Sequence, residues 1–144
     1  RLINYHIMRF KVRRLHEYRQ EILDFLVNIK NSFLPDIVVG PSVNDIHQDH
    51  QVVAREMFRA FKCDTSIICY ELPWNHINFS TQLFVKLEKH HIELKTELLS
   101  KYKSQITLKR PYFENEYIFG LAKVRGIQIK SEYAESFEVV RWVI

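Results

Sequence analysis

The stretch PDIVVGPSVNDIHQDH, residues 35–50, decides the fold of this chain. Residues 36–39 form a short apolar, β-branched run, which predicts a buried strand. Residues 40–45 contain the glycine and proline of a turn, and residues 48–61 have apolar side chains at helical spacing. The chain therefore passes from the carboxyl end of a strand into a helix, which is where open α/β sheets bind ligands.

The same alternation continues on both sides of this stretch. Apolar spacing predicts a preceding helix over residues 15–33, which ends before Pro35. Further strands are predicted over residues 65–72, 83–85 and 137–144, and further helices over residues 87–102 and 115–125. Helices alternating with strands predict a Rossmann-like α/β fold, with a mostly parallel sheet covered by helices on both faces. A length of 144 residues fits a single domain over residues 1–144.

Four side chains at this strand-to-helix junction could form a chemical site. His47 and His50 are three residues apart, close enough to face one site, and neutral imidazole is the commonest metal ligand in proteins. Asp45 and Asp49 could orient the two rings through their second nitrogen atoms. The spacing alone is equally compatible with a solvated, acidic helix start that carries two ordinary histidines.

The wider pattern extends this interpretation. Residues 35–39 followed by D-I-H-Q-D-H at residues 45–50 resemble the second signature of the PIG-L, or LmbE-like, zinc-dependent N-deacetylases. The resemblance continues at residues 70–75, 101–105 and 133–137. It implies an LmbE-like fold, Zn²⁺ as cofactor, and hydrolysis of an N-acetyl group on an N-acetylglucosaminyl conjugate.

The resemblance also implies roles for individual residues. His50 would bind zinc, His47 would polarise the amide and stabilise the oxyanion, and Asp49 would hold His47. The family's first signature, a loop of the H-P-D-D-E type, is absent from these residues. That loop supplies the other zinc ligands and the general base. We therefore expect a C-terminal portion of a deacetylase domain that lacks its N-terminal strand or strands, and we expect no activity from the 144-residue chain alone.

Substrate contacts are expected from loops that follow the strands. Asn44 and Asp45 lie in the first of these loops, and Trp74 lies in the next. Trp74 could stack on a sugar or cap the core. Glu135 could join them from the last segment, and Arg14, in a basic cluster, could contact phosphate or could simply be solvated.

Composition limits the other functions. The net charge of +4 and pI near 9.1 come from scattered charges, which argues against nucleic-acid binding. No apolar run approaches the ~20 residues of a membrane span. Cys63 and Cys69 show no metal-type spacing and are typical of reduced thiols in a cytoplasmic protein. The main alternative is a degenerate, non-catalytic deacetylase fold that binds a sugar or a partner, and a homo-oligomer is compatible with either.

Overall fold

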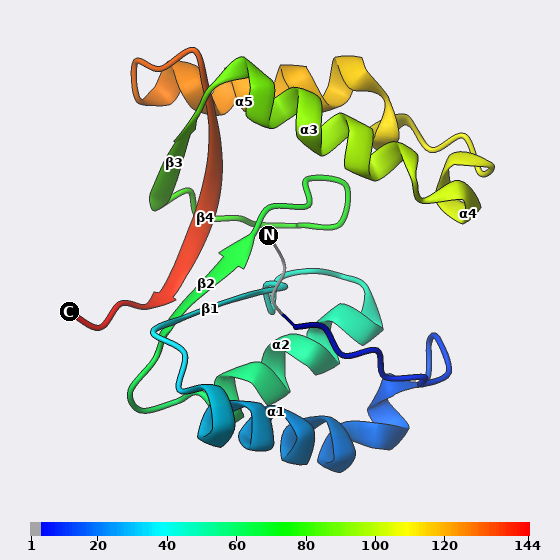
Figure 1. The fold of residues 1–144 in the computed structure, drawn as a ribbon, viewed down its shortest axis with the longest axis vertical. Helices are drawn as coiled ribbons and strands as arrows, with labels where there is room; N and C mark the ends of the chain where they lie inside the picture. Colours follow the sequence, from blue (N-terminus) through cyan, green and yellow to red (C-terminus); the bar gives the residue numbers. More distant parts are fainter. Residues whose placement is uncertain (1–3) are drawn as a thin grey trace. The chain divides into compact units, whose positions relative to one another are not determined.

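A computed structural model describes residues 4–144 (Figure 1). The helices are η1 (Leu15–Tyr18), α1 (Arg19–Phe33), α2 (Gln48–Ala60), α3 (Lys89–Ser100), α4 (Lys103–Ile106), η2 (Pro111–Phe113) and α5 (Asn115–Gln128), and the strands are β1 (Ile37–Gly40), β2 (Ser66–Tyr70), β3 (Leu83–Leu87) and β4 (Tyr133–Arg141). The predicted alternation is confirmed, with most element ends displaced by a few residues. The largest displacement is in the last strand, which begins at Tyr133 rather than at residue 137.

The chain divides into two compact units. Unit 1 contains Arg1–Phe79 and Val139–Ile144, and unit 2 contains Ser80–Glu138. Unit 1 holds α1, β1, α2 and β2, whereas unit 2 holds β3 and the helices from α3 to α5. The boundary falls within β4, and the single domain expected over residues 1–144 stays a prediction.

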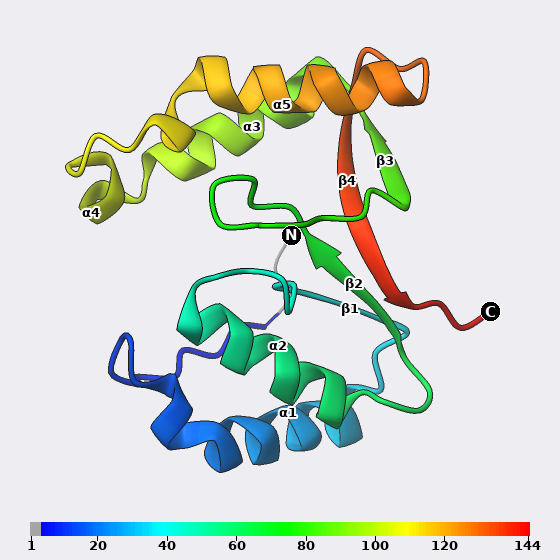
Figure 2. The same ribbon diagram turned by 180° about the vertical axis from the view of Figure 1, so that it is seen from behind.

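The strands form a mixed sheet in the order β1-β2-β4-β3. β1 and β2 are parallel, with Ile37 opposite Ser66 and Gly40 opposite Cys69. β3 and β4 are antiparallel, with Leu83 opposite Phe137. The expectation of a mostly parallel sheet is therefore wrong for unit 2. The physical reason is the connection: α3 and α5 run in opposite directions between β3 and β4, so the chain returns antiparallel to β3 (Figures 1 and 2).

The core of unit 1 lies between its helices and the β1–β2 pair. Met57, Ala60 and Phe61 pack with Ile67 and Cys69 of β2, and side chains of α1 cover this cluster. The end of β1 approaches α2 closely, since a Cβ atom at Gly40 would overlap the sulfur of Met57. A side chain at residue 40 would therefore displace the flexible end of Met57.

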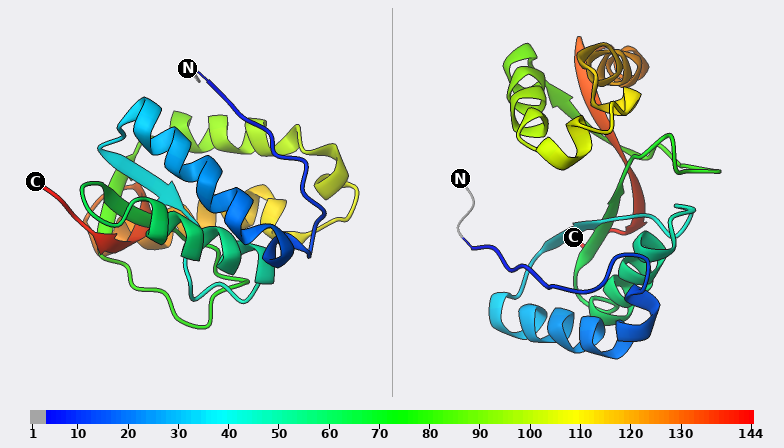
Figure 3. Two further views of the ribbon diagram at one scale, coloured as in Figure 1. Left: turned by 90° about the horizontal axis from the view of Figure 1, so that it is seen from below. Right: turned by 90° about the vertical axis from the view of Figure 1, so that its right-hand side faces the viewer.

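Strand β1 is less buried than its apolar sequence predicts. Ile37 is 48% exposed and Val39 is 52% exposed, whereas Val38 packs against the core. Figure 3 shows the reason, because α1 and α2 lie on the same side of the β1–β2 pair. The predicted buried strand is thus buried on one face only, as alternation of side chains along a strand requires.

Helices α1 and α2 are joined by an ion cluster inside unit 1. Glu56 of α2 is fully buried and its two carboxylate oxygens bind different arginines. Arg19 Nε donates to Glu56 Oε1 at 2.6 Å, and Arg59 donates to Oε2 at 2.5 Å. Because a lone buried carboxylate is strongly unfavourable, the two guanidinium groups make this position tolerable and fix the helix pair.

Unit 2 has a core of its own. Ile92 of α3 packs with Ile118 and Ala122 of α5, and Leu87 and Tyr133 of the strands cover this cluster. None of the helices within residues 4–144 combines the length and apolarity needed to cross a membrane. A cytoplasmic location and homo-oligomerisation stay predictions.

Candidate active site at the start of helix α2

His47 is the N-cap residue of α2. Its backbone is extended, and its ring Nδ1 accepts the backbone N–H of Asp49 at 3.2 Å. A ring nitrogen that accepts this N–H carries no proton, so the neutral ring carries its proton on Nε2. The helix cap therefore fixes both the orientation and the tautomer of His47, and leaves an N–H donor on the far side of the ring.

Asp45 organises both histidines. This carboxylate is fully buried, and its Oδ1 accepts the backbone N–H of His47 at 2.7 Å. Its Oδ2 accepts the Nδ1–H of His50 at 2.7 Å. The His50 side chain is about one-third exposed, and no hydrogen bond within residues 4–144 involves its Nε2. A histidine that donates one ring N–H to a carboxylate and leaves its other ring nitrogen unbonded has the arrangement of a metal ligand.

The two imidazole rings lie against each other. Their centroids are 4.5 Å apart and their planes are 27° apart. The structure therefore brings His47 and His50 to one place, as their spacing of three residues predicts. The two rings differ in tautomer, because Nδ1 of His47 accepts a hydrogen bond and Nδ1–H of His50 donates one.

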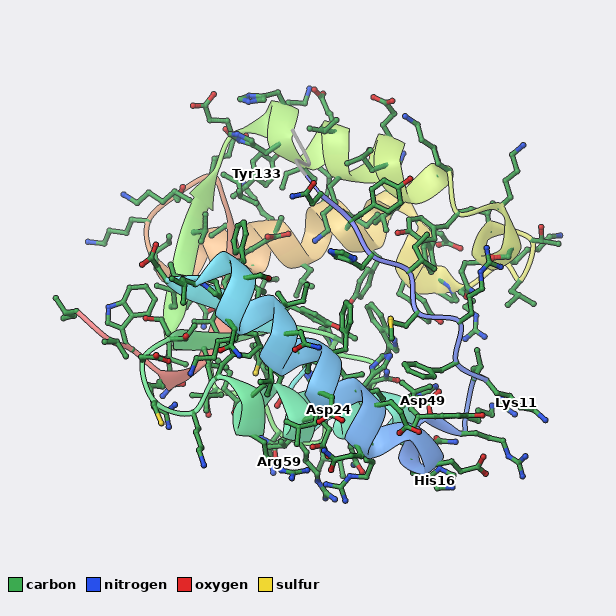
Figure 4. The ribbon with its side chains drawn as sticks, turned by 60° about the horizontal axis from the view of Figure 1, so that its bottom comes forward. Lys11, His16, Asp24, Asp49, Arg59 and Tyr133 are labelled. Atoms are coloured by element: carbon green, nitrogen blue, oxygen red, sulfur yellow. The ribbon has the colours of Figure 1, made fainter. Side chains whose placement is uncertain are left out.

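Asp49 contacts a segment that the sequence did not connect with the site. Its carboxylate is buried and accepts two backbone N–H groups, from Arg13 at 2.6 Å and from Leu15 at 3.3 Å. Figure 4 shows Asp49 near the N-terminal end of α1, where the labels of His16 and Lys11 also lie. Asp49 thus holds His47 through its backbone amide, while its carboxylate anchors the segment that precedes η1.

The loop after β2 meets the loop after β1. Asp45 and His76 form a β-bridge, and the backbone N–H of Ile46 donates to the carbonyl of Asn75 at 3.0 Å. The side-chain amide of Asn75 donates to Asp45 Oδ2 at 3.5 Å. Parallel pairing of β1 and β2 places both loops at one edge. Trp74, in the second loop, is 40% exposed, which fits a surface platform better than a core residue.

Tyr70, at the carboxyl end of β2, adds a neutral hydroxyl group near the site. Burial raises the pKa of Tyr70, and the negative charge of Asp45 raises it further. The sequence placed Tyr70 and Asn75 within the family resemblance at residues 70–75 and placed Asn75 in the loop expected to line the pocket. It assigned neither side chain a role of its own.

The other sequence candidates have different surroundings. Arg14 is exposed and pairs with Glu17 at 3.1 Å. Asn44 is exposed, and its backbone N–H donates to Ser42 Oγ at 3.1 Å. Glu135 belongs to unit 2, where it pairs with Lys95. Substrate contacts of these residues stay predictions.

The residues fit one ligand of a zinc centre rather than a complete centre. Within residues 4–144 there is no group of three or more His, Cys, Asp or Glu side chains placed to hold a metal ion. A catalytic zinc normally has three protein ligands and a water. His50 has the carboxylate partner and the exposed nitrogen of such a ligand, whereas His47 caps the helix.

Three solved structures have a similar fold. The 4-carboxy-2-hydroxymuconate hydratase GalB from Pseudomonas putida KT2440 has a TM-score of 0.68 and 17% identity, over 87% of this chain and 60% of its own. The zinc-inhibited form of teicoplanin deacetylase Orf2 has a TM-score of 0.66 and 18% identity, over 92% and 55%. The N,N'-diacetylchitobiose deacetylase from Pyrococcus horikoshii, complexed with an inhibitor, has a TM-score of 0.62 and 17% identity, over 96% and 55%.

These comparisons define the class of fold. The chain has the α/β fold of these three structures, of which two are deacetylases and one is a hydratase. It spans 55–60% of the length of these three structures. By sequence, no family model and no curated protein matches the chain. The likeness to known proteins therefore rests on the fold alone.

Proposed function

We propose that this chain is the C-terminal part of a zinc-dependent N-deacetylase that acts on an N-acetylglucosaminyl conjugate. The observation that supports this most directly is the 2.7 Å hydrogen bond between His50 Nδ1 and the buried carboxylate of Asp45. The resemblance of residues 35–50 to the LmbE-like signature and the similarity of the fold to two deacetylases support the same reaction class.

His50 is the residue that would hold the metal. Asp45 accepts the Nδ1–H of His50 and thereby fixes the ring and its tautomer, so Nε2 is the nitrogen left for a ligand. Zinc, when bound at such a site, lowers the pKa of its water toward ~7 and polarises a carbonyl group. The remaining ligands and the general base would come from polypeptide outside these 144 residues.

His47 would act on the oxygen of the amide. Its Nε2–H can donate a hydrogen bond to the negative charge that develops on this oxygen when water attacks the carbonyl carbon. The cap from Asp49 N–H holds the ring in that tautomer before the reaction begins. A preorganised donor of this kind is typically worth about 3–4 kcal/mol in the transition state.

The experiment has two parts. Zinc titration of the 144-residue chain by calorimetry should show weak binding that His50→Ala removes, whereas the control His91→Ala, in unit 2, should leave it unchanged. Amine release from N-acetylglucosaminyl conjugates should appear only in a longer polypeptide that contains this chain. Sugar binding without amine release in that polypeptide would instead identify the non-catalytic alternative. Full activity of the 144-residue chain alone would contradict the proposed division of the site.

A further inference from the structure

Residues 9–14, which precede η1, place basic side chains beside the first turn of α2, where the two histidines lie. Asp49 directly precedes His50, and its buried carboxylate binds the backbone N–H groups of Arg13 and Leu15. Arg13 adopts a left-handed conformation, with φ of 66°, and the N–H of Arg14 donates to the carbonyl of Lys11 at 3.1 Å. This turn is therefore fixed to the start of α2 although 34–36 residues separate the bonded groups in sequence.

The segment has one apolar side and one basic side. Met8 and Phe10 line an apolar pocket against α1 and α2, and the Phe10 ring stacks on Tyr18 with centroids 4.9 Å apart. The alternate residues Arg9 and Lys11 are exposed, as is Arg13. In an extended segment successive side chains point to opposite sides, so the packing of Met8 and Phe10 leaves Arg9 and Lys11 on the opposite side. Arg13 lies in the turn that follows and is exposed there.

Within residues 4–144, Arg9, Lys11 and Arg13 form no ion pair, whereas Arg14 pairs with Glu17. The two carboxylates of the site are buried and already bonded, Asp45 to His50 and Asp49 to backbone N–H groups. The exposed charge beside the start of α2 is therefore positive, and the helix dipole adds to it.

We propose that Arg9, Lys11 and Arg13 form a subsite for a phosphate group on the substrate, so that the conjugate is a phosphorylated N-acetylamino sugar. The proposal rests on the deacetylase function above, because that function places the acetamido group at His50. Two exposed arginines and an exposed lysine within five residues of an anchored segment suit an anion with several oxygen acceptors, which guanidinium groups bind in pairs.

The test compares three probes on the 144-residue chain by NMR titration of backbone amides and histidine rings. The probes are N-acetylglucosamine 1-phosphate, unphosphorylated N-acetylglucosamine and inorganic phosphate. The phosphorylated sugar should shift signals of residues 9–15 and of His50. It should bind about tenfold or more tightly than the neutral sugar, since charged hydrogen bonds typically contribute this much.

Two matched variants locate the effect. The triple variant Arg9→Gln, Lys11→Gln, Arg13→Gln should bind both sugars with equal affinity. The control triple variant Lys89→Gln, Lys101→Gln, Lys123→Gln, in unit 2, makes the same change in net charge and should keep the preference. All six residues are exposed, so both variants should unfold at the wild-type temperature.

The outcomes separate this proposal from the function on which it rests. Equal affinity for the two sugars, with His50 still shifted, would overturn the phosphate subsite and leave the deacetylase site intact. Shifts at residues 9–15 from inorganic phosphate as large as those from the sugar phosphate, with no response at His50, would overturn the sugar conjugate as ligand. No shift at residues 9–15 with either phosphate-containing probe would overturn the phosphate subsite.

Discussion

Two helices of this protein begin with a pair of histidines and an acidic residue, and only one of these starts resembles a site. At α2, the acid is Asp45, which is fully buried and binds His50 at 2.7 Å. At α3, the acid is Glu88, whose side chain is 79% exposed and pairs with His90 at 3.3 Å. In both, a histidine Nδ1 accepts a backbone N–H, at His47 and at His91.

The difference between the two helix starts lies in the carboxylate rather than in the histidines. An exposed carboxylate next to an exposed histidine contributes little, because solvent screens the pair. A buried carboxylate must be satisfied, so Asp45 binds the His50 ring, the backbone of His47 and the amide of Asn75. Histidine spacing therefore indicates a candidate site. Burial of the partner carboxylate is what holds the histidine rings in place before a ligand binds.

The largest expected effect is on turnover. In a longer polypeptide with an intact active site, His47→Ala should cut amine release by about 100-fold or more, because a preorganised oxyanion donor is lost. Zinc content, measured by atomic emission, should be unchanged. His91→Ala removes the histidine that accepts a backbone N–H at the start of α3 and should leave turnover at the wild-type value. Equal losses in the two variants would show that capping, rather than chemistry, explains the effect.

The second effect is on metal affinity. Asp45→Asn keeps the size of the side chain but removes the charge that orients His50. Loss of such a partner typically costs about 10–100-fold in affinity. Zinc titration of the same longer polypeptide should show this loss, while Glu88→Gln should show none. An unchanged affinity in Asp45→Asn would mean that His50 is not a ligand.

The third effect is on stability. Asp49→Ala leaves the N–H groups of Arg13 and Leu15 without their acceptor and should lower the free energy of unfolding by about 1–3 kcal/mol. The exposed Glu88→Ala at the other helix start should cost about 1 kcal/mol or less. Urea unfolding followed by circular dichroism measures both. The comparison would fail if Glu88→Ala were the more destabilising change.

The sequence predicted the fold where local pattern decides it. The apolar periodicity of α1 and α2 and the β-branched run of β1 each correspond to an element of the structure. The antiparallel return of β4 and the exposed face of β1 were mispredicted. Both depend on how distant segments pack, since an apolar run does not reveal whether one face or two are covered.

The candidate site was likewise predictable only where its contacts are local in sequence. The juxtaposition of His47 and His50 follows from a spacing of three residues, and it was predictable. The bond from Asp45 to Asn75 and the bonds from Asp49 to Arg13 and Leu15 join residues about 30 or more positions apart, and no periodicity encodes them. These long-range bonds turn a common histidine motif into an ordered arrangement.

The smallest expected effect is on the pH dependence of stability. It depends on Tyr70, which lies near Asp45 and is partly buried, unlike a tyrosine on the exposed surface. Burial, and then the charge of Asp45, raises the pKa of Tyr70 above its ordinary value of about 10. Between that value and the raised pKa, the unfolded chain has lost the phenolic proton and the folded chain retains it. Unfolding therefore becomes more favourable as pH rises through this window, and the stability contribution is complete only below about pH 10.

Tyr70→Phe tests this effect because it removes the titrating group and keeps the ring. The free energy of unfolding, measured in urea from pH 8 to pH 11, should fall less steeply in the variant than in the wild type. Tyr102→Phe, at a ring that is 61% exposed, serves as the matched control. Identical slopes in wild type and Tyr70→Phe would show that Tyr70 is not held protonated by burial, and that the interior beside Asp45 is open to water.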